Sequence, residues 1–527
     1  MNIYFIGMCV SFVVYIVIGF AISRKVKDAN DFYVAGRRAP ILLIVGSMIA
    51  SYASTGLFMG DAGEDYSGLF SPIIILATMQ VTGYIYGAVF FGRYLRRSEV
   101  LTIPEFFGKR FCSEKVRKLA TATAIITMTV YLLSIMQGIG TLMHVVTGVD
   151  YNLCIILALI AFVIVSVASG ASGVLITDTI MFAVFTVALV AGTIVITNRA
   201  GGWFSIIDDL VNFSGKSGLL SWGGNTDYLY SSGIQNVLWA VIYGIVWMSV
   251  CMVGPWQSSR YLMAKNEHVV VRSALFSALG IFLLELLVGM SAVSVNLLNP
   301  NLESASHVLI WASMNVMPTA LGVLMLTGVL AAGVSSATTF LSLIGSSVAN
   351  DIFRGRGNAI RIGQVAMVLV SVVVLLLAVF NPPQIFWILY FGSAIVASSW
   401  MPVVVASILS KRVTRAGAFC GMLTGFVGCF AVKLYSALSG VALPIYLDNT
   451  LVGIVLNVVA MVIGSLLTSV TEEETVARKQ LFVVPPEEKD PKEVKKTRNY
   501  LKASIILGAL ITAILLFVWA VPVARLH

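Results

Sequence analysis

The amino-acid sequence predicts an all-α polytopic membrane protein with about 14 transmembrane helices. Of its 527 residues, 58% are hydrophobic and only 11% are charged, and the mean hydropathy is +0.93. A water-soluble core of this size could not hide so much apolar surface. Stretches of about 20 apolar residues, enough to span a hydrocarbon core of roughly 30 Å, occur near 2–23, 39–60, 70–92, 119–147, 152–170, 173–198, 234–256, 273–297, 318–350, 362–380, 384–409, 416–436, 450–470 and 501–523.

The positions of the basic residues support these spans and predict their orientation. Lys and Arg collect on the cytoplasmic side of membrane proteins. With the N-terminus outside, 30 of the 34 Lys and Arg residues fall in cytoplasmic loops, which begin at Arg24, Arg93, Arg260, Arg354, Lys411 and Arg478. We therefore expect a protein of the cell (inner) membrane with both termini outside. The net charge of +9 reflects this bias, and no nucleic-acid partner is expected.

The sequence lacks the residue patterns of a soluble catalytic domain. Its six Cys and four His show no metal-ligand spacing, and neither a P-loop nor a GxSxG motif is present. We expect no enzyme, no disulfide framework and no obligate protein partner. Residues 471–500 are rich in Pro and charge and predict a cytoplasmic linker that does not fold alone.

The second apolar stretch has small polar residues at its centre. In SMIASYASTGLFMGDAG, residues 47–63, the interrupting residues are Ser51, Tyr52, Ser54, Thr55 and Gly56. Such a run is a poor helix interior, and unwound backbone at membrane depth needs an ion or a substrate to satisfy its polar groups. Close helix packing by small residues is the alternative.

Two intramembrane acids are further candidates, because ionisable groups are costly at membrane depth. Asp178 has no Lys or Arg within one helical turn. It is either functional or exposed to water at the cytoplasmic mouth. Glu285, in GIFLLELLVGM, is either a coupling or gating carboxylate or a group that faces a vestibule or a partner.

The ninth stretch carries AAGVSSATT at residues 331–339. On a helix, Ala332, Ser335, Ser336 and Thr339 share one face, with Thr338 beside it. Hydroxyls and freed carbonyls are oxygen ligands that suit hard cations. Small residues also serve close packing, so both interpretations stay open at this point.

Six motifs occur in register over roughly residues 30–415: DFYVAGRRAP, SMIASYASTGLFMG, LTIPEFFGKRF, SGASGVLITDTIM, QSSRYLMAK and AAGVSSATTFLSLIGSSVANDIF. By these motifs the chain resembles the sodium/solute symporters, a family that includes bacterial sodium/galactose, sodium/proline and sialic acid transporters. The resemblance implies a LeuT-like 5+5 inverted-repeat fold with extra N- and C-terminal helices.

The same resemblance implies the organisation of the chain. We expect an N-terminal extra helix and cytoplasmic loop at 1–38, a first repeat at 39–198, an extracellular loop at 199–233, a second repeat at 234–409, and C-terminal extra helices at 410–527. The helices that open each repeat, at 39–60 and 234–256, should be broken, with the transport site between them.

Carried over by position, the resemblance also implies sodium (Na+) sites. The shared site would use the backbone carbonyls of Ala50, Ala53 and Ala332 with the hydroxyls of Ser335 and Ser336. Some members hold a second sodium, and the corresponding positions here are Asp178, Ser335, Thr338 and Thr339.

The implied substrate pocket differs from that of the sugar transporters. It would contain Ser51, Tyr52, Ser54, Thr55, Leu57, Ala77, Gln80, Trp247 and Tyr390. Tyr52, Leu57 and Ala77 replace the Asn, Gln and Glu of the sugar site, which disfavours galactose-like substrates. Free N–H groups near Ser54 to Gly56 would suit a carboxylate.

These expectations combine into a sodium-coupled symporter that imports a small organic solute, such as a monocarboxylate or an amino acid, by alternating access. Its partners are then this small-molecule substrate and the lipid bilayer. The alternatives are a proton-coupled symporter, in which Asp178 or Glu285 titrates, and a transporter-like sensor or channel.

Overall fold

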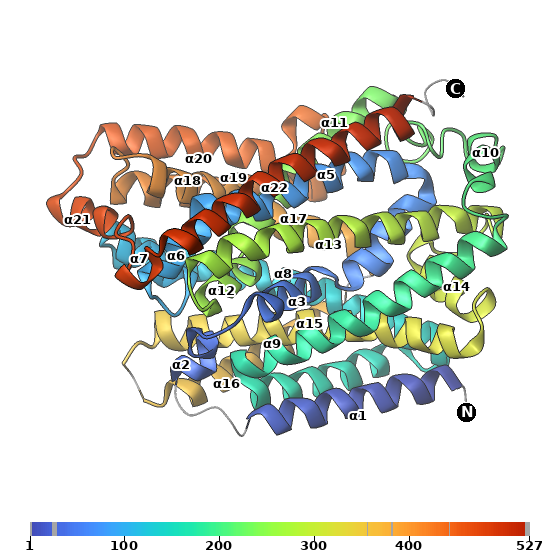
Figure 1. Ribbon diagram of the computed structural model, residues 1–527, viewed down its shortest axis with the longest axis horizontal. Helices are drawn as coiled ribbons and strands as arrows, with labels where there is room; N and C mark the ends of the chain where they lie inside the picture. The colour runs from blue at the N-terminus through green and yellow to red at the C-terminus, as the bar shows by residue number, and fades with distance from the viewer. Residues whose placement is uncertain (1–2, 24–28, 356, 381–382, 442, 522–527) are drawn as a thin grey trace.

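The computed structural model describes residues 3–23, 29–355, 357–380, 383–441 and 443–521, and they fold into a bundle of helices that run along the long axis of the molecule (Figure 1). Within these residues, 11 helices are long and apolar enough to cross a membrane. Three shorter apolar helices accompany them, at Ile3–Tyr15, Ile41–Tyr52 and Tyr151–Val167. The protein is therefore a multi-pass membrane protein.

The first half of the chain forms α1 (Ile3–Ser23), α2 (Ala29–Val34), η1 (Ala35–Arg37), α3 (Ile41–Tyr52), η2 (Gly56–Asp61), α4 (Ala62–Glu64), η3 (Asp65–Leu69), α5 (Phe70–Gly87), η4 (Ala88–Gly92), α6 (Arg93–Ser98), α7 (Ile103–Phe111), α8 (Glu114–Thr147), α9 (Tyr151–Arg199) and α10 (Ser205–Val211). The second half forms α11 (Gly233–Val253), α12 (Pro255–Met263), α13 (Glu267–Ser294), η5 (Val295–Leu297), η6 (Ala305–His307), α14 (Val308–Asn315), α15 (Thr319–Ser347), η7 (Val348–Ile352), α16 (Ala359–Phe380), α17 (Ile385–Ser399), α18 (Met401–Leu409), α19 (Arg415–Ser439), η8 (Ile445–Leu447), α20 (Asn449–Leu466), α21 (Glu472–Gln480), η9 (Pro486–Glu488), α22 (Pro491–Ile514) and η10 (Leu515–Ala520).

The fifth and sixth expected spans belong to one helical element, α9, which has 49 residues. A straight helix of that length would measure about 73 Å, more than twice the thickness of the hydrocarbon core. The short turn expected at 171–172 does not end the helix. The total of about 14 spans therefore stays a prediction.

The second helix that was expected to be broken is interrupted near its end. α11 ends at Val253, Gly254 adopts φ −55° and ψ 136°, and α12 starts at Pro255. Proline fits the first turn of a helix but ends the one before it. The expected span at 234–256 therefore continues as far as Met263.

The two broken helices are tied together at one end of the bundle. The Ala39 N–H, just before α3, donates to the Met263 carbonyl at 3.1 Å, and the Lys265 N–H donates to the Ala39 carbonyl at 3.0 Å. This short parallel bridge fixes the end of α12 against the start of α3.

The described ends of the chain lie at the same end of the bundle, at its opposite edges (Figure 1). The start of α1 and the end of α22 are both at the right of Figure 1, near α10 and α14, whereas α2, α6, α7, α12 and α21 gather at the opposite end. The elements that carry the basic loops therefore share one end, although the first such loop, from Arg24, lies outside the described residues as far as residue 28.

The linker expected at 471–500 is ordered against the bundle. α21 starts with a capping box between Thr471 and Glu474, and the buried Glu474 carboxylate also accepts from the Arg415 N–H at 2.5 Å. Arg97 donates to the Leu481 carbonyl at 3.1 Å. These contacts to other helices supply the stability that so polar a segment lacks alone.

Candidate functional site

The site starts at the end of α3, where the helix breaks inside the bundle. α3 ends at Tyr52, and Ala53 is extended at φ −67° and ψ 92°. The chain re-enters a helix at Gly56 as the π-helix η2. Ending a helix leaves its last carbonyls without partners from the next turn, so this break presents free backbone oxygens, as the sequence predicts.

The hydroxyl-rich face of α15 lies against this break. The Ser336 hydroxyl donates to the Ser51 carbonyl at 3.4 Å. All five residues of the expected shared sodium site are fully buried, namely Ala50, Ala53, Ala332, Ser335 and Ser336. The two walls that the sequence predicts for a cation site are therefore neighbours, and their oxygens match what a hard cation binds.

Asp178 is not an isolated carboxylate. Its Oδ2 lies 3.0 Å from the guanidinium of Arg260, which comes from α12. The Ser47 hydroxyl donates to the same oxygen at 2.6 Å, and the Ser335 hydroxyl donates to Oδ1 at 2.6 Å. The absence of a nearby Lys or Arg in the sequence was misleading, because the cation comes from 82 residues away.

The other two residues of the expected second sodium site, Thr339 and Thr338, form hydrogen bonds with Arg260 and with their own helix, respectively. Arg260 donates to the Thr339 hydroxyl at 2.9 Å, whereas the Thr338 hydroxyl donates to the Ser335 carbonyl at 3.0 Å. Within the cluster of Asp178, Ser335 and Thr339, the positive charge is thus supplied by a guanidinium.

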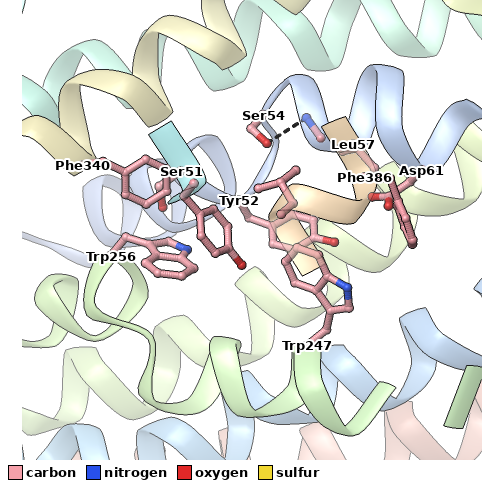
Figure 2. A pocket seen from close by; sticks show the side chains of 12 residues that line it. Ser51, Tyr52, Ser54, Leu57, Asp61, Trp247, Trp256, Phe340 and Phe386 are labelled. Carbon is pink, nitrogen blue, oxygen red and sulfur yellow. Dashed lines mark hydrogen bonds between the residues drawn. The ribbon is translucent and has the colours of Figure 1, made fainter. Parts of the chain in front are cut away.

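A small cavity of about 10 Å³ lies beside the break, with room for about one water molecule. Five expected substrate residues line it: Ser51, Tyr52, Ser54, Leu57 and Trp247. The other lining residues are Gly56, Asp61, Tyr131, Trp256, Phe340, Phe386 and Leu389. Figure 2 shows Asp61 beside Phe386 at one end of this central pocket, and Trp256 with Phe340 at the other.

Four expected substrate residues do not line the central pocket. Thr55 packs against Gly138 of α8. Ala77 and Gln80 are buried on α5. Tyr390 lines a separate, outer cavity of about 140 Å³, where its hydroxyl donates to Asp448 at 2.9 Å. The Tyr390 ring stacks on Tyr243 with centroids 3.5 Å apart, and its role in substrate binding stays a prediction.

Asp448 belongs to this outer cavity and lies in the connection between α19 and α20. Its carboxylate caps α20 by accepting from the Thr450 N–H at 2.8 Å. Burial raises the pKa of this carboxyl, and the hydrogen bonds from Thr450 and Tyr390 oppose the shift.

Glu285, on α13, joins a buried hydrogen-bond network with the end of α3. Its Oε1 accepts a short hydrogen bond from the Tyr52 hydroxyl and a second from Gln80 Nε2 at 2.9 Å. Gln80 Nε2 also donates to the Tyr52 hydroxyl at 2.8 Å. Glu285 Oε2 has no hydrogen-bond partner among the described residues. A buried acid thus contacts a residue that lines the central pocket.

The sequence reasoning missed two charged residues of this region. Asp61 lies in the stretch singled out for the helix break, and with Glu64 and Asp65 it has the i, i+3, i+4 spacing of one helix face. Arg260 lies in the motif QSSRYLMAK. Three closely spaced acids and a single arginine, each next to an apolar stretch, were the sequence features that could have identified these two residues as functional candidates.

Comparisons with known proteins agree with this geometry. The model of the sodium:solute symporter family matches residues 32–425. The sodium/proline symporter of Salmonella typhimurium is 24% identical over 455 residues, covering 81% of this chain and 88% of that protein. The sodium/glucose cotransporter of Vibrio parahaemolyticus is 23% identical, covering 85% and 86%.

Solved structures show the same fold. A Na+-coupled sialic acid symporter in a substrate-bound, outward-open state superposes with a TM-score of 0.74 at 17% identity, covering 90% of this chain and 99% of that one. The nucleobase-cation-symport-1 transporter Mhp1, in a closed conformation, gives a TM-score of 0.59 at 12% identity, covering 86% and 99%. The fold is therefore the LeuT-like inverted-repeat fold.

Proposed function

Because this chain belongs to the sodium:solute symporter family, as the match over residues 32–425 shows, we propose that it couples sodium entry to the import of a small organic solute. The observation that carries the proposal is the contact between the hydroxyl face of α15 and the broken end of α3. Sodium at this contact would join two separate helices, and the same break lines the central pocket.

The proposed sodium site uses the carbonyls of Ala50, Ala53 and Ala332 and the hydroxyls of Ser335 and Ser336. We propose a single sodium per cycle. A second ion at Asp178 would have to share its carboxylate and hydroxyl ligands with the Arg260 guanidinium, which already lies 3.0 Å from the carboxylate.

The proposed solute is small and partly apolar, such as a monocarboxylate or an amino acid, because the central pocket is walled mainly by aromatic side chains. Sodium and solute are coupled because both complete the surroundings of one helix break. Of the N–H groups at the break, that of Gly56 already bonds to the Ser54 hydroxyl at 3.0 Å, so a carboxylate would need the neighbouring groups or the ion itself.

We propose that both termini lie outside. Both described chain ends lie at one end of the bundle and the basic elements cluster at the other end, which supports this orientation.

The test measures sodium binding without knowledge of the substrate. The purified protein is heated in NaCl or in KCl at equal ionic strength, and its apparent Tm is recorded. Sodium should raise the Tm of the wild type, because a ligand that binds the folded state stabilises it. The Ser336→Ala variant should need more sodium for the same shift.

The matched control is Ser346→Ala on the same helix, whose hydroxyl donates to its own helix carbonyl at Leu343. It should respond to sodium like the wild type. An equal sodium response in Ser336→Ala and Ser346→Ala would contradict the assignment of the site.

The Glu285 network supports a second candidate, proton-coupled import. A buried acid with one unpaired oxygen, in contact with a pocket residue, is the kind of group that carries protons. In proteoliposomes, uptake that follows an imposed pH gradient without sodium and is lost in Glu285→Gln would favour this candidate.

A further inference from the structure

We propose that the imported solute carries an ammonium group and that Asp61, within the aromatic walls of the central pocket, binds this group. This inference rests on the proposed function and narrows its substrate class. It favours amino acids and amines over simple monocarboxylates.

Asp61 is the one charged residue among the twelve that line the described cavity. It lies at the end of the π-helix η2, directly after the helix break. No salt bridge to Asp61 occurs among the residues that the structure describes. Its carboxyl group therefore lines the pocket without an ion-pair partner among the described residues.

The charged neighbours of Asp61 are also acidic. Glu64 and Asp65 follow it at i+3 and i+4 on the same helix face, and Glu285 accepts a hydrogen bond from Tyr52, another lining residue. Asp65 is fully buried, and neither of its carboxylate oxygens has a hydrogen-bond partner among the described residues. The Oε2 of Glu285 is likewise buried and unpaired. A cation next to Asp61 would stabilise the charged form of its carboxyl group beside these other acids.

The walls of the central pocket suit an organic cation. The Trp247 ring contacts the rings of Tyr52 and Tyr131 edge to face, with centroids 6.1 and 6.4 Å apart. The ring centroids of Tyr131 and Trp256 are 4.2 Å apart. Phe386 lies beside Asp61 (Figure 2). Aromatic faces attract ammonium groups, and Trp does so best. A carboxylate beside aromatic rings therefore offers both interactions that bind an alkylammonium.

Two other occupants fit this end of the pocket less well. A metal ion held by His, Cys, Asp or Glu would need several of these side chains together, and the described residues contain no group of three or more that could hold one. A solute whose only charged group is a carboxylate would be repelled by the Asp61 carboxylate, and no basic residue lines the pocket to bind it. The carboxylate of an amino acid can instead lie at the break near the proposed sodium.

The experiment compares probes that share a shape and differ in charge. L-proline, pyrrolidine and cyclopentanecarboxylate form one set, and choline and its neutral isostere 3,3-dimethyl-1-butanol form another. Binding to the purified full chain in NaCl is followed by the apparent Tm and by tryptophan fluorescence, since Trp247 and Trp256 line the pocket. At least one ammonium probe should bind, and its partner without the ammonium group should bind about tenfold to hundredfold more weakly.

Asp61→Asn should abolish this preference, and Asp61→Glu should retain it because the charge is kept. The matched control is Asp208→Asn, an exposed acid on α10. A cooperative thermal unfolding transition in each variant shows that it is folded. If Asp61→Asn lacks this transition, the preference is compared between the wild type and Asp61→Glu.

Binding of cyclopentanecarboxylate in preference to pyrrolidine and proline would overturn the proposal, as would binding of no ammonium probe or an unchanged preference in Asp61→Asn. The proposed function is judged separately. Ammonium preference without any sodium effect on Tm would support the role of Asp61 and contradict sodium coupling.

Discussion

Replacing Arg260 by alanine leaves Asp178 without its cation inside the helix bundle. The guanidinium is 1% exposed and lies 3.0 Å from a carboxylate that is fully buried. At that distance and an effective dielectric constant of about 20, the Coulomb attraction amounts to about 5.5 kcal/mol. Removing one partner of a buried pair typically costs about 3–5 kcal/mol, because an uncompensated charge stays behind.

This cost predicts a measurable loss of thermal stability. Taking an unfolding entropy of about 2.1 cal/mol/K per residue over 527 residues, the Arg260→Ala variant should unfold about 3–5 °C below the wild type. The measurement is the apparent Tm of the purified protein in detergent. The double variant Arg260→Ala/Asp178→Asn should recover part of the loss, because it buries no unpaired charge.

The control is Arg354→Ala. Arg354 lies 3.9 Å from Glu114, and both side chains are about two-thirds exposed. Exposed pairs contribute about 0–1 kcal/mol, so this variant should unfold close to the wild type. An Arg260→Ala variant as stable as Arg354→Ala would refute the buried pair, as would a double variant less stable than Arg260→Ala alone.

Three further predictions follow from other contacts. Gly83→Ala should destabilise the protein by about 1–3 kcal/mol, because the added methyl group overlaps a backbone carbonyl of α11; Gly508→Ala, which meets nothing within 4 Å, should leave the Tm unchanged. Tyr52→Phe removes the hydroxyl shared with the buried acid of α13 and should cost about 1–3 kcal/mol, whereas Tyr86→Phe, at an exposed ring, should cost almost nothing. Burial lowers the pKa of Lys216, in the loop before α11, from 10.5 to about 8; between these two values the unfolded chain holds a proton that the folded chain has released. Stability due to Lys216 should therefore rise with pH in that window. A series of Tm measurements should show this slope in the wild type and a flatter one in Lys216→Met.

The helix break and the hydroxyl face of α15 could be predicted because local composition determines both. Ser54 and Thr55 interrupt an apolar helix, and the spacing of Ser335, Ser336 and Thr339 places them on one face whatever surrounds them. The partner of Asp178 could not be predicted in this way, since it depends on how α12 packs against α9 and α15. The break at Gly254 lies inside the helix expected to be broken, but the continuation of that helix to Met263 was not predicted, because the apolar stretch ends soon after Pro255.

The pocket was only partly predictable for a related reason. Carrying positions over from relatives finds the places where those relatives are polar, so Trp247 and Leu57 were located and the acid at position 61 was not. Tyr390 was placed in the pocket by the same comparison, although its hydroxyl bonds to Asp448 and Thr450 in the outer cavity. The ordered conformation of residues 471–500 depends on contacts to other helices, which the composition of the segment does not reveal.

Under the proposed cycle, the arginine at Asp178 would also limit the ratio of internal to external solute that the cell can reach. A sodium ion that crosses 100 mV releases about 2.3 kcal/mol, and a tenfold sodium gradient adds about 1.4 kcal/mol. Under the proposed single-sodium cycle, a solute without net charge could be accumulated about 500-fold. A second ion would raise that limit to about 10⁵-fold. A guanidinium fixed to the protein returns with the empty carrier and contributes nothing to this driving force. The transporter would therefore reach a lower solute gradient, but it would use fewer sodium ions per molecule imported.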